Sequence, residues 1–585
     1  MSLIALRRWI LPDAVELSAP DGIPPLVARI LAARGIELPA MADFIAARAV
    51  ENGPPMLDLD RAVERLRRAL AARERIVVYG DYDVDGVAGS ALLVRAFRRL
   101  GFTVGAYIPD RYEEGYGINA GALRTIAAGG VTLVISVDCG ITAVAEAALA
   151  RELGIDLIIT DHHHPPPTIP NAYAVVNPRR PGDPSLDKEL SGAGVAYAIA
   201  RDLLGDAFAA HESELLQLAA AATVADVVPL RAGNRHLVRR GLAALNASPI
   251  VGLRALAERA GLKIGAVTAS EIGWVIGPRL NAAGRIADAT DALRLLLTED
   301  AAEAKTLADR LEERNAERQR LTQDVVRGAR ERALERPDAW ATVVADAGWT
   351  AGIVGLAASR LVEDHGRPAV VIAIDGAEGK GSCRSIGGVH IAEALAECTD
   401  LLTKHGGHAM AAGFSVPVAN IDAFRERLDA VVRTRLGGVR PVPTVIVDAE
   451  LEPTALTPRL AMELALLEPC GAANPRPHLL LRDVRVFGVR PVGVDADHLR
   501  CKLTVGKFTF DAMAFRRGGN ADDVSLEGRV DAVVTVGIGL RGFVELEIRD
   551  LGPVGTADAM SRVAAETVLA TMRGVGGGRS PLPTL

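Results

Sequence analysis

The fold is decided by one stretch near the start of the chain, Ile76-Val-Val-Tyr-Gly-Asp-Tyr-Asp-Val-Asp-Gly86. It opens with an apolar run of strand length, continues as an acidic loop, and leads into a helical pattern of apolar residues from Val87 to Leu100. Short apolar runs recur at 104–108, 132–137 and 156–160, with helical stretches between them. Such alternation is typical of a parallel sheet covered by helices on both faces. It predicts an α/β domain over residues 71–300, mainly helical after about residue 190.

The remaining sequence predicts further segments on either side of this domain. Residues 1–70 are predicted to form short helices punctuated by prolines. Residues 301–336 are predicted to form one long amphipathic helix, which fits a surface helix as well as the linking helix between two domains that we expect. A second α/β block is expected at 337–438, followed by alternating strands at 439–553 that predict a small β barrel. Residues 554–585 form a C-terminal tail, whose Gly- and Pro-rich part, Gly574–Leu585, is expected to be disordered.

Composition and charge exclude several classes of protein. The 585 residues are 49% hydrophobic and 24% charged, the balance of a folded chain with several cores. A formal net charge of −7 argues against an overall basic coat, so any polyanion site must be a local patch. Five scattered cysteines without a C-x-x-C pair favour a reducing compartment, and we expect a cytoplasmic location. Residues 1–20 have no long apolar run, so neither a signal peptide nor a membrane anchor is expected.

Acidic and histidine side chains gather where the predicted strands end. In an open parallel sheet these ends share one edge, and ligands bind there. Gathered carboxylates repel one another unless cations compensate them, and oxygen and nitrogen donors without sulfur suit Mn²⁺ or Mg²⁺. A single aspartate after a strand is most often a helix cap, so the argument depends on their joint occurrence. The residues are Asp81, Asp83, Asp85, Asp138, Asp161, His162, His163 and, after a helical run, Asp226.

The motifs around these residues resemble those of a known superfamily. Gly80-Asp-Tyr-Asp-Val-Asp-Gly86, Val137-Asp-Cys-Gly140, Thr160-Asp-His-His163 and Ala225-Asp-Val-Val-Pro-Leu230 are similar to the four ordered motifs of DHH phosphoesterases. Ile276-Gly-Pro-Arg-Leu-Asn-Ala-Ala-Gly-Arg285 narrows the resemblance to the RecJ family of single-strand-specific exonucleases. Gly381-Ser-Cys-Arg-Ser385 and 406–413 resemble the associated DHHA1 domain, and 467–475 resembles the entry to the family's OB-fold domain.

The resemblance implies a centre with two divalent cations, Mn²⁺ or Mg²⁺. One cation would be held by Asp83 and Asp138. Asp138 would bridge to the second, and the further ligands of the second would be Asp85, His162 and Asp226. The sequence departs from the family pattern at one position. Tyr79 stands where many DHH phosphoesterases have a histidine ligand, so the first cation is expected to have fewer protein ligands here.

Other residues receive supporting roles by the same resemblance. His163 would contact the scissile phosphate, Asp161 would orient His162, and Asp81 would lie at the edge of the metal site. Catalytic roles thus fall on His163 and the five metal ligands. The residues expected to bind the phosphates of the substrate are Arg111, Arg279, Ser382, Arg384 and His408.

The predicted β barrel carries basic residues interleaved with aromatic ones, a pattern that fits an OB-fold binding single-stranded nucleic acid. Strand alternation predicts that some of the phenylalanines are core residues. The barrel segment holds no proposed metal ligand, so a truncation near Gly438 is expected to spare the metal site. The residues are Arg482, Arg485, Arg490, Arg500, Lys502, Lys507, Arg516 and Arg517, with Phe508, Phe510 and Phe515.

The activity implied is that of a 5′→3′ exonuclease which degrades single-stranded DNA to 5′-mononucleotides in recombination and repair. Two alternatives stay open from the sequence. One is a DHH phosphodiesterase of short oligonucleotides or cyclic dinucleotides, although such chains generally stop after the DHHA1 block. The other is a binding scaffold that has lost metal ligands, although every ligand position is filled here. We expect the protein to be a monomer that binds single-stranded DNA and does not associate with membranes. The resemblance is also compatible with a helicase and a single-strand-binding protein as partners.

Overall fold

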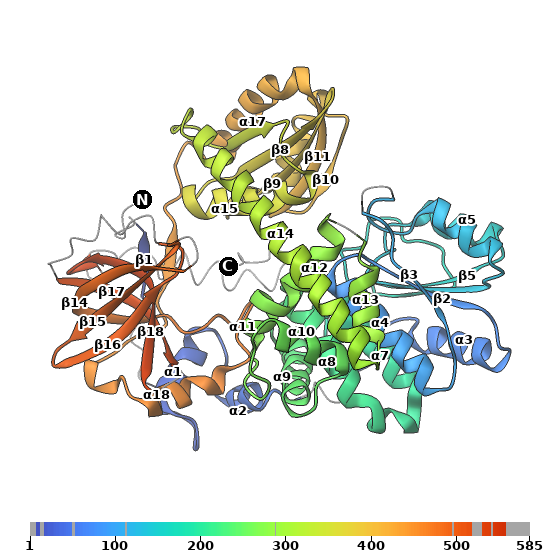
Figure 1. Ribbon diagram of the computed structural model, residues 1–585, viewed down its shortest axis with the longest axis horizontal. Coiled ribbons are helices and arrows are strands. Elements are labelled where there is room, and N and C mark those ends of the chain that lie inside the picture. The colour runs from blue at the N-terminus through green and yellow to red at the C-terminus, as the bar shows by residue number, and fades with distance from the viewer. Residues whose placement is uncertain are drawn as a thin grey trace. The chain divides into compact units, whose positions relative to one another are not determined.

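The computed structural model describes residues 7–11, 17–48, 53–111, 114–286, 288–493, 496–517, 529–539 and 542–556 (Figure 1). The chain forms two compact units, each with its own core. One comprises Ala46–Leu321 and Pro469–Pro475, and the other comprises Met1–Ile45, Thr322–Glu468 and Arg476–Leu585. Within the described ranges, no helix combines the length and the apolar character needed to cross a membrane.

A five-stranded, wholly parallel sheet forms the centre of the first unit. Its strand order, β3-β2-β4-β5-β6, makes β2 and β4 neighbours and places β5 next to β4. The carboxyl ends of these three strands therefore lie side by side at one edge, as the sequence predicts. The strands are β2 (Ile76–Gly80), β3 (Gly105–Tyr107), β4 (Leu133–Val137), β5 (Asp156–Thr160) and β6 (Ala174–Val176).

Helices cover both faces of this sheet because its strands are apolar on both sides (Figure 1). Alternate residues of β2 separate two cores: Ile76 and Val78 pack in one, and Val77 and Tyr79 in the other. The first core contains α3 (Leu59–Ala71), α4 (Val84–Arg99) and α7 (Gly192–Leu204), and the second contains α5 (Ala120–Ala128) and α6 (Val144–Glu152).

The rest of this unit is helical, as predicted after about residue 190. Helix α8 packs against α4, α7 and α9. A one-turn π-helix, Ile272–Ile276, runs directly into α12. The elements are α8 (Phe208–Ala225), α9 (Ala232–Ala247), α10 (Val251–Arg259), α11 (Ala269–Glu271), α12 (Gly277–Ile286), α13 (Thr290–Leu297) and, up to Leu321, the long helix α14 (Ala301–Ala333), with a short 3₁₀ turn at Gly205–Ala207.

The second unit begins its α/β part after α14. Strands β7 and β8 are parallel, and β9, β11 and β10 continue the sheet in antiparallel fashion. Helices α16 and α17 share a core with Val370, Ile372 and Phe414 of this sheet. The elements are β7 (Thr342–Asp346), α15 (Ala351–His365), β8 (Ala369–Asp375), β9 (Glu378–Arg384), α16 (Ile391–Ala396), β10 (Lys404–Gly407), β11 (Ala411–Pro417) and α17 (Ile421–Arg435).

The predicted β barrel is present as a sheet that closes on itself. Its order is β13-β14-β15-β16-β18-β17, and a further pairing between β14 and β17 closes a five-stranded barrel. The elements are β13 (Ala449–Glu450), α18 (Pro458–Leu464), β14 (Leu479–Val492), β15 (His498–Val505), β16 (Phe508–Ala514), β17 (Arg529–Ile538) and β18 (Val544–Pro553).

The N-terminal segment differs from the short helices expected over residues 1–70. Strand β1 (Arg8–Ile10) pairs in parallel with β12 (Thr444–Ile446), and Trp9 donates its indole N–H to Asp550 Oδ2 at 2.7 Å. Helices α1 (Pro25–Ala33) and α2 (Leu38–Ala46) follow, whereas α3 packs in the core of the first unit. The predicted tail lies outside the described residues from 557 onward.

Candidate metal centre

The acidic loop after β2 is shaped by glycines and by a cap. Asp83 is the N-cap of α4, and its Oδ1 accepts hydrogen bonds from the backbone N–H groups of Asp85 at 2.9 Å and Gly86 at 3.2 Å. A Cβ atom on Gly86 would lie 2.5 Å from the backbone nitrogen of Asp81, so the turn requires glycine. Asn281 of α12 also accepts the backbone N–H of Val84 at 3.2 Å.

Asp138 follows β4 directly and has a left-handed backbone, with φ of 63°. Gly192, the first residue of α7, lies against it: a Cβ there would be 2.6 Å from Asp138 Cβ and 2.8 Å from its Oδ1. The same helix N-terminus holds Asp85, whose two oxygens accept the N–H groups of Gly192 at 2.6 Å and Ala193 at 2.8 Å. The start of α7 therefore positions two of the predicted ligands.

The predicted ligands converge on His162. Its Nε2 lies 3.1 Å from Asp138 Oδ1, 3.5 Å from Asp226 Oδ2 and 3.7 Å from Asp85 Oδ2. Asp81, Asp83 and Asp138 form an adjacent group whose ligand atoms all lie within 4.8 Å of one another. The sequence places Asp81 only at the edge of the metal site. In the structure its carboxylate is close enough to those of Asp83 and Asp138 for all three to bind the same cation.

Without a bound cation, the buried carboxylates of this cluster repel one another, which makes their charged forms unfavourable. Burial, followed by the charges of neighbouring aspartates, raises the pKa of Asp138, Asp81 and Asp226 well above the ordinary value. Burial and the charge of Asp83 raise the pKa of Asp85 to about 7. Burial and nearby His163 lower the pKa of His162 to about 3, so its ring is neutral and can offer a lone pair.

Unpaired buried atoms show that divalent cations fit here. Asp81 Oδ1, Asp138 Oδ1 and His162 Nε2 are buried, and no hydrogen-bond partner for them lies in the part of the chain that the structure describes. Such atoms cost free energy unless something compensates them. Carboxylate oxygens and a neutral imidazole are the donors that Mn²⁺ and Mg²⁺ accept, and cations would remove the repulsion.

Asp161 contacts His163 more directly than His162. Its Oδ1 lies 2.7 Å from both the backbone nitrogen of His162 and the ring Nδ1 of His163, and its Oδ2 accepts the backbone N–H of Ile141 at 2.8 Å. Burial alone would raise the pKa of Asp161, but the hydrogen bond and charge of His163 lower it. Burial would lower the pKa of His163, but Asp161 raises it. The carboxylate therefore orients the ring of His163, whereas the sequence predicts that it orients His162.

Tyr79 does not take over the role of the missing histidine. Its hydroxyl donates to the carbonyl of Gly117 at 3.1 Å and accepts the N–H of Asn119 at 3.2 Å. Both partners lie in the loop that leads into α5. The Tyr79 hydroxyl therefore holds this loop.

Two of the predicted phosphate-binding arginines belong to the same unit. Arg111 lies over the ring of Tyr82, 4.9 Å from its centroid, and its charge lowers the pKa of Asp81 against the larger effect of burial. Arg279 is engaged elsewhere, because its guanidinium pairs with Glu312 on α14 at 2.5 Å and donates to the carbonyl of Val275 at 2.8 Å. Arg279 thus already has an acidic partner in the described structure.

The other three predicted substrate residues lie in the second unit. Ser382 and Arg384, on β9, face the first turns of α15, where a Cβ on Gly355 would lie 3.2 Å from Arg384 Nη2 and 3.5 Å from Ser382 Oγ. His408 follows β10 in the turn to β11, and its backbone N–H donates to the carbonyl of Ala411 at 2.8 Å. Strand β11 pairs with β9 so that Ala411 is opposite Arg384, which places these residues at one end of the sheet.

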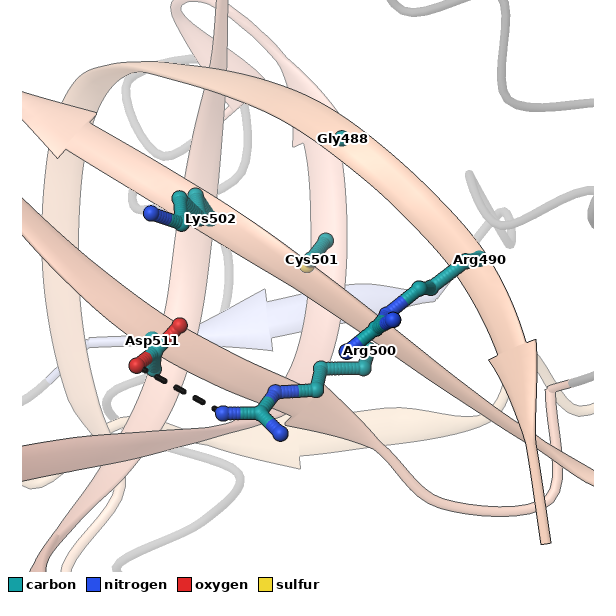
Figure 2. A pocket seen from close by; sticks show the side chains of 6 residues that line it. All are labelled: Gly488, Arg490, Arg500, Cys501, Lys502 and Asp511. Carbon is teal, nitrogen blue, oxygen red and sulfur yellow. Dashed lines mark ion pairs between the residues drawn. The ribbon is translucent and has the colours of Figure 1, made fainter.

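The barrel carries a basic cavity of about 320 Å³ (Figure 2). Figure 2 shows Arg490 of β14 beside Arg500 of β15, with Asp511 of β16 facing Arg500 at 3.6 Å. The cavity is lined by Gly488, Arg490, Arg500, Cys501, Lys502 and Asp511.

Only part of the predicted basic and aromatic set is available to a ligand. Arg482, Arg500, Arg516 and Arg517 lie within 4 Å of Glu450, Asp511, Glu363 and Asp550, respectively. Phe508 and Phe510 are half-buried on the side of β16 that bears the buried Ala512 and Ala514, whereas Phe515 is 49% exposed.

Three residues of this centre were not singled out from the sequence. Gly192 belongs to Ser191-Gly-Ala-Gly194, in which Ser191 caps α7, and this pattern could have marked the close approach. Asn281 lies within a recognised motif without an assigned role. The Tyr116 hydroxyl lies 3.2 Å from His163 Nδ1 and 3.3 Å from the carbonyl of Asp138, and no local signal predicts this contact.

Comparison with known proteins agrees with this architecture. Three protein-family models match the chain. The model of the DHH family, N-terminal domain, matches residues 75–223, that of the DHHA1 domain matches 338–434, and that of the RecJ OB domain matches 447–549. A parallel sheet with an acidic carboxyl edge, followed by a DHHA1 domain, defines a protein of the DHH class.

The similarity extends over most of the chain. The single-stranded-DNA-specific exonuclease RecJ of Bacillus subtilis (strain 168) is 38% identical over 542 residues, which cover 91% of this chain and 68% of that protein. The crystal structure of RecJ in complex with Mn²⁺ from Thermus thermophilus has a TM-score of 0.78 at 34% identity, over 93% of this chain and 79% of that one. The corresponding Mg²⁺ complex has a TM-score of 0.72 at 33% identity, over 93% and 78%. The chain belongs to the RecJ family.

Proposed function

We propose that this protein is a metal-dependent exonuclease that degrades single-stranded DNA from its 5′ end to 5′-mononucleotides, in DNA recombination and repair. One observation carries the proposal: buried carboxylates meet the neutral ring of His162 with unpaired atoms that face one another, in a chain of the RecJ family. The activity named for the Bacillus subtilis relative supports it.

The cations are two Mn²⁺ or Mg²⁺ ions. Asp83 and Asp138 would hold one of them, with Asp81 in reach as a third ligand. Asp138 would also contribute to the second, together with Asp85, His162 and Asp226. When bound, such a pair activates a water for attack on phosphorus and stabilises charge on the leaving oxygen.

The protein's own residues prepare the phosphate for this reaction. Asp161 keeps a proton on Nδ1 of His163, and the raised pKa of His163 favours the doubly protonated ring. The second ring N–H, on Nε2, then donates to a non-bridging oxygen of the scissile phosphate. Arg111 and Arg279 of the first unit, and Ser382, Arg384 and His408 of the second, are the proposed contacts to the substrate phosphates. Arg279 also forms an ion pair with Glu312.

The barrel favours a long polymer over a small substrate. The basic cavity and the exposed Phe515 supply phosphate contacts and a stacking surface, which short oligonucleotides and cyclic dinucleotides do not need. The protein acts as a monomer in the cytoplasm, where its five unbridged cysteines remain reduced. A helicase and a single-strand-binding protein are compatible partners because they supply and cover such strands.

A nuclease assay with both ends of a long single strand distinguishably labelled tests the proposal. With Mn²⁺ we expect mononucleotides from the 5′ end, and no product with EDTA or from a blunt duplex. Cleavage of cyclic dinucleotides alone would favour the small-substrate alternative. Metal-independent binding without cleavage would favour a scaffold.

A further inference from the structure

In the described part of the chain, hydrogen bonds hold the carboxylates of Asp83 and Asp85, but not those of the proposed ligands Asp138 and Asp226. Asp85 accepts two backbone N–H groups from the start of α7, and Asp83 accepts two from α4. Among the described residues, no hydrogen bond reaches the Asp226 carboxylate, although it lies 3.5 Å from His162 Nε2. Its position is therefore set by the backbone that carries it.

That backbone is strained immediately after Asp226. Asp226 is the C-cap of α8, and Val227 follows with φ of 59°. A β-branched residue rarely adopts this left-handed conformation, which persists only where surrounding contacts impose it. The loop 226–231 then leads to α9, with Val228 and Leu230 buried.

The contact that anchors this loop comes from a distant part of the sequence. The backbone N–H of Leu230 donates to the carbonyl of Ala472 at 2.9 Å. Ala472 lies in Pro469–Pro475, which belongs to the first unit, the one with the metal centre (the metal-binding unit), although the chain on both sides of it belongs to the other unit. A Cβ on Gly471 would lie 2.7 Å from Leu230 Cδ1, so the two segments pack without space for a side chain.

Two buried donors hold the 469–475 loop in place. The carbonyl of Pro469 accepts Arg235 Nη1 at 3.0 Å and Asn474 Nδ2 at 2.9 Å. Arg235, 234 residues earlier in the chain, and Asn474 are each 1% exposed. Removing either donor leaves a buried carbonyl with fewer partners, which weakens the anchor.

We propose that the 469–475 loop is a positioning element of the metal centre. Through Leu230 it fixes the strained loop 226–231 and so places the Asp226 carboxylate for the second cation. This inference rests on the proposed function. Arg235 and Asn474 are thus positioning residues, whereas the resemblance assigns this segment only to the entry of the barrel.

Mn²⁺ binding to the full chain, measured by calorimetry and by electron paramagnetic resonance without substrate, tests this proposal. Loss of supporting contacts around a metal ligand typically lowers affinity about 10–100-fold. Arg235→Met and Asn474→Ala should therefore weaken one Mn²⁺ site at least tenfold and leave the site of Asp83 and Asp138 unchanged. Arg235→Lys should restore part of the affinity. Arg240→Met is the matched control, because Arg240 lies on the same helix and pairs with Glu212 instead.

Each outcome supports or overturns the proposed role of the loop. Hydrogen exchange at the Leu230 amide should accelerate in both variants, and the Mn²⁺ concentration for half-maximal activity should rise more than kcat falls. If Asn474→Ala and Arg235→Met are folded and bind both ions within threefold of wild type, the proposal is wrong. Equal weakening of both sites would also overturn it, since that indicates general destabilisation. If wild type itself binds no Mn²⁺, the proposed function fails instead.

Discussion

Replacing Gly192 by alanine should disable the metal centre without unfolding the protein. The added Cβ would lie 2.6 Å from Asp138 Cβ and 2.9 Å from its Cα. Carbon atoms need about 3.5 Å, so Asp138 must retreat by roughly 1 Å. Ligand distances in a metal site are expected to agree with their usual values to within about 0.2 Å. A misplacement of this size costs about 100-fold in rate, or about 2.7 kcal/mol of transition-state stabilisation.

The assay compares Gly192→Ala with Gly273→Ala, a control in the π-helix. A Cβ on Gly273 meets only Val224 Cγ1, at 3.6 Å, which is ordinary contact. Mn²⁺ affinity and cleavage of a labelled single strand are measured for both, with circular dichroism to verify folding. Gly192→Ala should lose at least 30-fold in activity, and Gly273→Ala should stay within threefold of wild type. If folded Gly192→Ala keeps wild-type Mn²⁺ affinity and activity, Asp138 is not held in its ligand position by this contact.

Three further predictions test the centre and the barrel. Asp138→Ala should retain less than about a tenth of the nuclease activity, which corresponds to a loss of more than ~1.4 kcal/mol of transition-state stabilisation. Binding of single-stranded DNA should persist in a gel-shift assay. Higher residual activity would contradict the role of Asp138 as a ligand shared by both cations. Burial raises the pKa of Asp85 in the folded protein to about 7, above its ordinary value of 3.8, so the folded state without metal binds more protons than the unfolded chain between these pH values. The melting temperature of the protein in EDTA should therefore fall between pH 5 and pH 8. Saturating Mn²⁺ should remove this fall, and a flat profile in EDTA would contradict the raised pKa. Changing both Arg490 and Lys502 to alanine should weaken the binding of long single strands and flatten the salt dependence of that binding. The rate of cleavage of very short oligonucleotides should stay within threefold of wild type. If the variant binds long strands as tightly as wild type across a salt titration, the cavity does not contribute to binding.

The sheet and the position of its acidic edge were predictable because they depend on local signals. The sequence predicts strands β2 to β5 as short apolar runs, and the chemistry directly follows β4 and β5 in Asp138 and Asp161, whereas it does not predict β6. The adjacency of β2, β4 and β5 then brings these residues together. Periodicity and motif order suffice for this part of the fold.

The contacts between distant segments were not predictable. The sequence indicates that cutting the chain near Gly438 spares the metal site, because no ligand lies beyond it. The structure removes the basis for that expectation, since Pro469–Pro475 packs against Leu230 and Arg235 of the metal-binding unit. Likewise, the pairing of Arg279 with Glu312 depends on how α12 meets α14. No pattern within either segment encodes such packing.

Strand β1 has a consequence for how the chain is made. Trp9, only 1% exposed, bonds to Asp550, which lies 541 residues later. At about 5–20 residues per second, a ribosome needs roughly 30–110 s to reach that partner. During synthesis the first strand must therefore wait, with its tryptophan exposed, while the parallel sheet of the metal-binding unit already has all five of its strands. A bulky fusion placed next to Trp9 should therefore delay closure of the barrel more than it disturbs the metal centre.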